Sequence, residues 1–339
     1  MFQKALRSAR ARLLAPLAPV LDEVRELRAS MERSLQLQGT QAAHRLRGLT
    51  TLETLADAEF RVYSQWGEDG ILEWLIQRLP ISSKRFIEFG VEHYREANTR
   101  FLLMNRNWAG LVMDASMEKI QGVCQDEIFW RYDLKAVSAF IHRDNINELI
   151  SRNGFSGRIG VLSIDIDGND YWVWEAIEVA DPDVVVCEYN AVFGDLHPIS
   201  VPYVADFDRT RAHPSNLYFG ASINALCLLG ARKGYELMGT NRAGLNAFFV
   251  RKDLAGAVDS SVASKVPANS AMRESRDEYG RLTYVPGLQR AKLIGEMPVV
   301  RVDTMETVKL ANLQPLYSQR WREVMESHGT YAAAAQGPH

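Results

Sequence analysis

The sequence predicts an α/β protein built on a mostly parallel sheet. Helix-like and strand-like patterns alternate from Phe60 onward, as they do where each strand is followed by a crossover helix. The strand-like runs are short, continuous and rich in Val, Ile and Leu, which is typical of parallel strands buried on both faces. With 339 residues, of which 47% are hydrophobic, the chain is long enough for one large domain plus an appendage.

The first segment, residues 1–49, is expected to be a helical extension. A helix over residues 1–15 would carry apolar side chains on one side and Lys and Arg on the other, which is typical of a contact with a membrane surface. Over residues 20–38 the apolar positions step by four, three and four, as on a coiled-coil seam that would join two copies of the chain. These positions are Val20, Val24, Leu27 and Met31. The alternative is a solvated helix packed loosely on the body.

The main domain is expected over residues 50–259. Helical spacing of apolar residues is found over residues 70–79, 98–107, 117–124, 136–152, 171–179 and 222–233. Apolar runs that end in an acid or a turn predict strands over residues 85–90, 110–114, 128–133, 158–165 and 183–188. Two further strands, 235–239 and 246–251, are joined by a short turn and predict an antiparallel pair at the sheet edge. The result is a Rossmann-like sheet of seven strands with helices on both faces.

Two segments do not fit the alternation. Residues 190–218 are long for a plain connection and carry aromatic and cationic side chains, among them Phe207 and Arg209. Connections of this length in a compact domain are usually functional or disordered, so we expect a lid over a ligand. Residues 260–339 are expected to be a C-terminal extension that packs on the domain and ends in a frayed tail.

Composition excludes several classes of protein. The net charge of −3 gives no overall attraction to nucleic acid. Cys124, Cys187 and Cys227 form neither a disulfide framework nor a CxxC metal site. No apolar run reaches the roughly 20 residues that span a bilayer, and the N-terminus lacks the pattern of a secretory signal. We therefore expect a cytoplasmic protein, held at the inner face of the membrane if residues 1–15 act as a tether.

Acidic residues close the predicted strands. They are Glu88, Asp114, Asp133, Asp165 with Asp167, and Glu188. A single acid at a strand end is commonly the N-cap of the next helix. Five strand ends in succession fit capping poorly, because carboxylates gathered at one edge repel each other unless hydroxyls, a cation or a positive sulfonium are bound there.

The turn after the first predicted strand narrows the choice of ligand. Gly90 allows close approach of the backbone, but the dinucleotide pattern G-x-G-x-x-G is absent, and a pyrophosphate would sit badly beside Glu88 and Glu92. A nicotinamide-dependent oxidoreductase is therefore disfavoured. A ligand with a ribose and an amino-acid part avoids this repulsion, and Asp114 ends the second strand, where an acid accepts both ribose hydroxyls.

These residues resemble the class I S-adenosylmethionine-dependent methyltransferases, and within them the FkbM type, which is related to the macrocin-type sugar O-methyltransferases. The likeness runs from about Arg61 to Arg251. Its motifs are Glu88-Phe89-Gly90, Ser64-Gln65-Trp66-Gly67-Glu68-Asp69, and Asp165-Ile166-Asp167-Gly168-Asn169-Asp170, which is similar to an Asp-x-Glu-Gly-x-Glu motif with aspartates in place of the glutamates.

The resemblance implies a role for each matched residue. Gln65, Glu88 and Gly90 would line the methionine part of S-adenosylmethionine, and Asp114 would accept the ribose hydroxyls. Asp133 would meet the adenine amino group, and Asp165 would lie near the sulfonium. In metal-dependent members a cation is held by acids after the fourth and fifth strands, which here are Asp165, Asp167 and Glu188 together with the amide of Asn190. Oxygen ligands of this kind suit Mg or Mn.

A sugar hydroxyl also needs help to lose its proton. Asp170 is one candidate base, although it is equally placed to cap the helix that follows. His93 follows the cofactor turn and His197 lies in the expected lid, so either imidazole is a candidate, while exposure in a loop is the ordinary alternative for both.

The leading functional prediction is an O-methyltransferase acting on a sugar, nucleotide-sugar or glycan, a setting that by resemblance is polysaccharide or natural-product assembly. A metal-dependent glycosyltransferase is the alternative, because Asp165-Ile166-Asp167 also satisfies a D-x-D nucleotide-sugar site. That alternative leaves Glu88, Gly90 and Asp114 without a role. A non-catalytic assembly factor on a methyltransferase scaffold is the third hypothesis.

Overall fold

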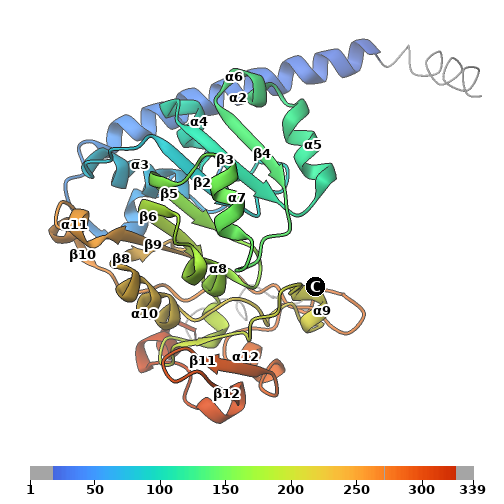
Figure 1. Ribbon diagram of the computed structural model, residues 1–339, viewed down its shortest axis with the longest axis vertical. Helices are drawn as coiled ribbons and strands as arrows, with labels where there is room; N and C mark the ends of the chain where they lie inside the picture. The colour runs from blue at the N-terminus through green and yellow to red at the C-terminus, as the bar shows by residue number, and fades with distance from the viewer. Residues whose placement is uncertain (1–17, 271, 326–339) are drawn as a thin grey trace, which may run out of the picture.

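The molecule is organised around one seven-stranded sheet. The computed structural model describes residues 18–270 and 272–325. The strand order is β4-β3-β2-β5-β6-β9-β8, and the predicted Rossmann-like α/β class is confirmed (Figure 1). The strands are β2 (Arg85–Phe89), β3 (Ala109–Asp114), β4 (Leu134–Ser138), β5 (Gly157–Ile164), β6 (Ala180–Glu188), β8 (Tyr235–Thr240) and β9 (Asn246–Arg251).

The sheet topology brings the acidic strand ends together. Strands β4, β3, β2, β5 and β6 run parallel, so their carboxyl ends share one edge of the sheet. Strand β9 is antiparallel to β6 and pairs with β8 at the edge, as predicted. The chain order reverses at β2, which lies between β3 and β5. In open α/β sheets the crevice at such a reversal is the usual place for a ligand.

Helices cover both faces of the sheet. Side chains alternate along each strand, so Phe86 of β2 joins the core on one face and Ile87 joins the core on the other. The face with Phe86 is covered by α3 (Glu68–Arg78), α4 (Arg100–Arg106), α5 (Met117–Gln125), α6 (Glu127–Arg131) and α11 (Lys252–Ala255). The face with Ile87 is covered by α7 (Ile146–Arg152), α8 (Asp170–Ala176) and α10 (Ile223–Lys233).

One predicted strand is wrong. Residues 128–131 belong to helix α6, and the strand follows as β4, so the predicted helix 136–152 is reduced to α7. The Asp126 side chain caps α6 by accepting a hydrogen bond from the Ile128 amide at 3.0 Å. Ile128 is buried while Trp130 is 72% exposed, so this apolar run has one buried side, as a helical turn on a surface does.

In its described part, from residue 18, the N-terminal extension forms a long helix, α2 (Ala18–Leu46), that runs across the body and extends past it at its N-terminal end (Figure 1). Its second half belongs to the body, because Glu32 pairs with Arg100 at 2.7 Å and Ala43 and Leu46 are buried. The seam residues Val20, Val24, Leu27 and Met31 are all more than half exposed. The predicted amphipathic segment 1–15 lies outside the described residues.

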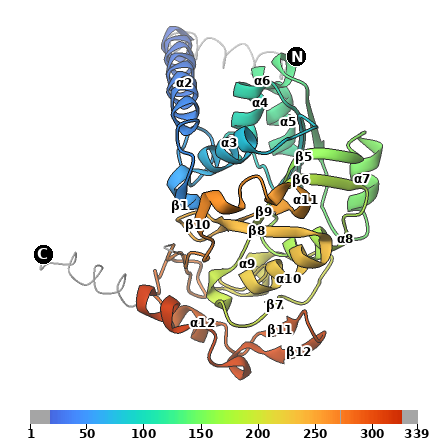
Figure 2. The same ribbon diagram turned by 90° about the vertical axis from the view of Figure 1, so that its left-hand side faces the viewer.

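The C-terminal extension returns to the domain at two places. Strand β10 (Val262–Ser264) pairs in parallel with β1 (Leu52–Thr54). Strand β11 (Pro298–Arg301) lies between β12 (Glu306–Lys309) and β7 (Ile199–Ser200), which fixes part of the expected lid 190–218. Strands β11 and β12 lie at the opposite end of the molecule from α2 (Figures 1 and 2). In the described part of the chain, no helix is both long and apolar enough to cross a membrane.

Candidate active site

A cavity of about 590 Å³ opens at the carboxyl edge of the parallel strands. Its size is in the usual range for small-molecule and cofactor sites. The lining includes most of the predicted site residues, namely Gln65, Glu88, Gly90, Asp114, Asp165, Asp167, Glu188 and Asn190. It does not include Asp133, Asp170, His93 or His197.

The turn after β2 depends on Gly90. Its φ is +72°, and a Cβ atom at this position would lie 1.7 Å from the carbonyl oxygen of Asp165. Only glycine therefore allows the ends of β2 and β5 to approach this closely. Glu88 holds the next segment in place, because its Oε1 accepts from the Asn98 amide at 2.8 Å and its Oε2 from the Thr99 amide at 3.1 Å. Burial raises the pKa of Glu88 to about 7.

Asp114 stands at the end of β3, beside this turn. Its two carboxylate oxygens accept backbone amides of Glu92 and Ser116, each at 2.8 Å. These bonds fix the carboxylate while each oxygen keeps a further lone pair for a hydroxyl donor from the cavity. Asp114 is therefore placed where the sequence predicted a ribose site, one strand away from Gly90.

Asp133 is not part of the site. It precedes β4, and its carbonyl accepts from Gly110 at the amino end of β3, so it lies at the opposite edge of the sheet. The strand that was expected to end at Asp133 begins after it. The cavity is lined instead by Ala139, Phe140 and Ile141, which follow β4. Phe140 is 48% exposed and offers an apolar face to a ligand. The sequence did not predict Phe140 as a site residue, because its pattern indicated a helix over residues 136–152.

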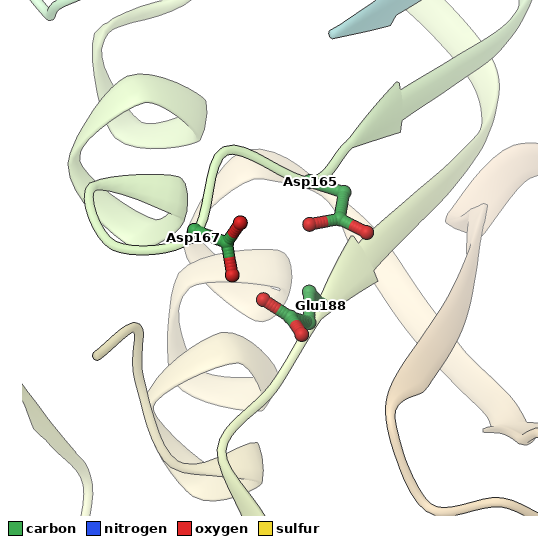
Figure 3. Close-up of side chains that lie close together, drawn as sticks. All are labelled: Asp165, Asp167 and Glu188. Carbon is green, nitrogen blue, oxygen red and sulfur yellow. The ribbon is translucent and has the colours of Figure 1, made fainter. Parts of the chain in front are cut away.

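Three carboxylates converge between β5 and β6. Oxygen atoms of Asp165, Asp167 and Glu188 all lie within 4.8 Å of one another, and Figure 3 shows them turned toward a common point. Asp165 and Asp167 follow β5, and Glu188 ends β6. Asp167 adopts a left-handed conformation, with φ at +56°, which brings its side chain back toward the other two.

Two of these carboxylates lack hydrogen-bond donors. Within the described residues no donor serves the side chain of Asp165, and Glu188 Oε2 is buried without a partner. Burial, and then repulsion by Asp167, raises the pKa of Asp165 well above its ordinary value. Burial, and then repulsion by Asp165, does the same to the pKa of Glu188. A group of oxygen atoms that repel each other and lack donors fits a hard divalent cation such as Mg²⁺ or Mn²⁺.

Arg209, from α9 (Arg209–Ala212) in the expected lid, supplies the counter-charge nearest this cluster. Its Nη1 pairs with Asp167 at 2.8 Å, and its guanidinium lies 3.8 Å from the centre of the Phe219 ring. Burial alone would lower the pKa of Arg209, but the attraction of Glu188 and Asp167 outweighs it and raises the value. Arg209 forms an ion pair with Asp167 and also attracts Asp165 and Glu188, yet the pKa values of both remain raised, so one guanidinium does not balance the three carboxylates.

Asn190, the fourth predicted metal ligand, lines the cavity, and its side chain also makes three hydrogen bonds. Its Oδ1 accepts from the Val192 amide at 2.9 Å, which caps η3 (Ala191–Phe193). Its Nδ2 donates to the carbonyls of Leu217 and Phe219, both at 2.9 Å. The amide therefore holds the two ends of the expected lid together, and the candidate metal cluster consists of three carboxylates.

The three predicted bases, Asp170, His93 and His197, do not line the cavity. Asp170 is buried, and its two carboxylate oxygens accept the amides of Ile166 and Gly168 at 2.8 and 2.9 Å, which shapes the loop that carries Asp167. His93 is exposed outside the cavity, and His197 Nε2 bonds to the Pro315 carbonyl at 2.9 Å. No described histidine lines the cavity. The structure therefore gives none of the three predicted bases direct access to the cavity.

The buried carboxylates of the Ser64–Asp69 segment hold the backbone next to the cavity in place. Asp69 Oδ2 accepts the amides of Val62, Tyr63 and Ser64 at 2.7 to 2.8 Å. Glu68 Oε1 accepts from the side-chain amides of Asn241 and Asn246, so the start of α3 is tied to β9. These buried carboxylates are structural, and of this segment only Gln65 lines the cavity.

The cavity is strongly acidic. Among the described lining residues, the eight carboxylates exceed the three cations, Lys119, Arg209 and Arg290. Such a cavity favours ligands that are rich in hydroxyl groups or carry positive charge, and it disfavours a pyrophosphate at the turn after β2.

Comparisons with known proteins give weak similarities. No protein-family profile matches the chain, and no curated protein does. The N-terminal domain of EvdMO1 with SAH bound matches over 62% of this chain and 94% of its own, at 12% identity and a TM-score of 0.38. The CurJ carbon methyltransferase matches over 54% of this chain and 52% of its own, at 13% identity and a TM-score of 0.34, so the match spans about half of that protein.

An S-adenosylmethionine-dependent methyltransferase from Mesorhizobium loti matches over 55% of this chain and all of its own, at 12% identity and a TM-score of 0.33. Scores and identities this low support no conclusion about function. The functional argument therefore depends on the residues of this chain.

Proposed function

We propose that this chain is an S-adenosylmethionine-dependent O-methyltransferase that modifies a sugar or glycan hydroxyl with the help of a divalent cation. The observation that carries the proposal is the pairing of two features in one cavity. Asp114 offers a fixed carboxylate beside the glycine turn of β2. Asp165 and Glu188, two and three strands away, form a carboxylate pair without hydrogen-bond donors among the described residues.

The cofactor would occupy the β2–β4 side of the cavity. Asp114 would accept the ribose hydroxyls, Gln65 and Glu88 would face the methionine part, and Phe140 would cover the adenine. Bound there, S-adenosylmethionine would supply a methyl group on a sulfonium, which is a good leaving group. The task of the protein is then to align the acceptor oxygen with that methyl group and to exclude water.

The acceptor would occupy the β6 side. Asp165, Asp167 and Glu188 would hold Mg²⁺ or Mn²⁺, which would lower the pKa of a coordinated hydroxyl. Arg209 and Phe207 line the same region and would position the sugar from the lid. Because no described histidine lines the cavity, a cation at the carboxylate cluster is the feature best suited to promote loss of the proton.

A metal-dependent glycosyltransferase is the second candidate, because Asp165 and Asp167 present their carboxylates to one point as a D-x-D site requires. It is the weaker one, since it gives Asp114 and the turn at Gly90 no ligand.

The exposed seam on α2 supports two further proposals, pairing of two copies of the chain and, less directly, recruitment as an assembly factor. A cytoplasmic location and a membrane tether through residues 1–15 also remain proposals.

Thermal melts separate the two enzymatic candidates. The full chain is melted alone, with S-adenosylhomocysteine, and with uridine diphosphate plus Mn²⁺. A ligand at 100 times its Kd stabilises a protein by about 2.7 kcal/mol, which is a readily measured shift in Tm. We expect stabilisation by S-adenosylhomocysteine, whether or not the nucleotide diphosphate also stabilises the chain. Stabilisation by the nucleotide diphosphate without any by S-adenosylhomocysteine would favour the glycosyltransferase, and no shift with either ligand would favour the assembly factor.

A further inference from the structure

The cavity contains one guanidinium that no carboxylate neutralises. Of the three cations lining it within the described residues, Lys119 pairs with Glu92 and Arg209 pairs with Asp167, each at 2.8 Å. Arg290 makes no ion pair with any described residue. Its Nη1 donates to the Met272 carbonyl at 2.7 Å, and its Nε is buried without a partner.

The guanidinium is therefore available to an anion from the cavity. The side chain of Arg290 is half-buried, and its buried Nε is an unsatisfied donor, which is costly until an acceptor binds. Burial lowers the pKa of Arg290 to about 10, so the guanidinium stays charged at neutral pH. Arg209 lies close enough to repel it. Arginine also presents its donors in a planar fork that matches carboxylate and phosphate groups.

The position of Arg290 places it at the acceptor side. It belongs to α12 (Gln289–Leu293), which packs against η3, the turn that follows β6. Asp114 lies on the other side of the cavity, at the end of β3, with β2 and β5 between. A smaller hollow of about 50 Å³ adjoins Arg290, and it is lined also by Arg273, an exposed cation that makes no ion pair with the described residues. Both arginines come from the C-terminal extension.

We propose that Arg290 binds an anionic group of the acceptor, a carboxylate or a phosphate, while the acceptor hydroxyl faces Asp165, Asp167 and Glu188. This inference rests on the methyltransferase function proposed above and deepens it. The acceptor would be an acidic sugar or a sugar linked through phosphate, and a neutral sugar would bind poorly. The acidic carboxylate cluster and the unpaired guanidinium would then recognise different parts of one molecule.

Calorimetry on the full chain saturated with S-adenosylhomocysteine, with Mg²⁺ throughout, tests this inference. The probes are methyl glucuronide, uridine diphosphate glucose and methyl glucoside, which carry a carboxylate, a diphosphate and no charge. The variants are Arg290→Met, Arg290→Lys and Lys292→Met. Lys292 lies on the same helix, is exposed and does not line the cavity, so its variant removes an equal charge without touching the site.

We expect at least one anionic probe to bind the wild type more tightly than methyl glucoside. Arg290→Met should weaken that probe roughly 10- to 100-fold, as expected for loss of a charge-assisted hydrogen bond, and Lys292→Met should leave it unchanged. Arg290→Lys should recover part of the loss. The probe that binds shows whether the anionic group of the acceptor is a carboxylate or a phosphate. Because Arg290 has no counter-ion and loses only its bond to the Met272 carbonyl, Arg290→Met should lower the Tm of the ligand-free protein slightly at most, whereas a merely structural arginine would lower it clearly.

The inference is overturned if the neutral probe binds as well as the anions, if no anion binds the wild type, or if both Met variants weaken binding equally. Binding of S-adenosylhomocysteine is measured separately in every variant. Its absence from the wild type would refute the proposed function, whereas its presence alongside any of the three results above would refute only the role of Arg290.

Discussion

Gly90 is the residue on which the geometry of the cavity depends most directly. The end of β2 passes so close to the Asp165 carbonyl that a methyl group has no room. A side chain there would force apart the two strand ends that carry Glu88 and Asp165. The same contact would then disturb both the cofactor side and the carboxylate cluster.

Gly90→Ala should therefore lower the free energy of unfolding by more than the strain of a left-handed conformation alone explains. Gly154→Ala is the matched control, because Gly154 has φ at +79° and no atom lies within 4 Å of the position that its Cβ atom would take. We expect about 1 kcal/mol of lost stability for Gly154→Ala and about 2–4 kcal/mol for Gly90→Ala, measured by urea unfolding. Equal losses would show that the approach of β2 to β5 is not constrained.

Residues at the ends of correctly predicted strands could be placed from the sequence. Glu88, Asp114, Asp165 and Glu188 all line the cavity because a parallel sheet brings its carboxyl ends to one edge. The placement of Asp133 at the cavity was wrong, because the strand that was expected to end at Asp133 begins just after it. The sequence around Arg290 does not indicate a ligand site, because this residue reaches the cavity only through packing of the C-terminal extension.

At the scale of elements, helix α2 consists of two halves with different surroundings. From Glu32 onward it contacts the body, and a Cβ atom at Gly39 would lie 2.5 Å from Val62 and 2.8 Å from Phe101. Before Glu32 its apolar residues face solvent in the single chain. The first half therefore suits pairing with a second copy, and the second half is part of the core.

Two truncations of the chain test this division. Removing residues 1–31 should leave Tm nearly unchanged and convert a dimer to a monomer in light scattering. Removing residues 1–49 should also expose the apolar surface that Ala43 and Leu46 cover. Each large apolar side chain that loses its burial lowers the free energy of unfolding by about 1.5–3 kcal/mol, so the Tm should fall clearly. An unchanged oligomeric state after the shorter truncation would reject the seam as an interface.

The elements that the sequence predicted well were those with long continuous apolar runs, such as β5 and β6. The run at 128–133 was too short for periodicity to separate a strand from a helical turn. Strand β10 was not predicted, because it pairs with β1, which lies far away in the chain. The place of β11 beside the expected lid was not predicted either, because its pairing with β7 joins distant segments, although its pairing with β12 is local. Local patterns carry little information on such pairing.

On the scale of the whole molecule, the carboxylate cluster couples stability to pH and to metal. The pKa values of Asp165 and Glu188 are raised in the folded state. The folded protein therefore holds protons that the unfolded chain has already lost, so this contribution to stability is present at low pH and is lost as pH rises through the raised pKa values. A bound cation would remove the repulsion.

We expect the rise in Tm caused by Mn²⁺ to be larger at about pH 8 than at about pH 5.5, because fewer protons must then be displaced from the cluster. Glu188→Gln should abolish most of this rise and should flatten the pH dependence of the metal-free protein. Treatment with EDTA should lower the Tm of protein loaded with Mn²⁺. An effect of Mn²⁺ that is the same at both pH values, or the same in Glu188→Gln, would reject the metal site.

The claim on which the account depends is that Asp114 and the turn at Gly90 bind the nucleoside of S-adenosylmethionine. Titration of S-adenosylhomocysteine into the full chain by calorimetry tests it most directly, with Asp114→Ala compared with Asp133→Ala at the opposite edge of the sheet. We predict one site in the wild type and in Asp133→Ala, and affinity lower by about tenfold or more in Asp114→Ala. No binding to the wild type, or equal binding to both variants, would contradict the account.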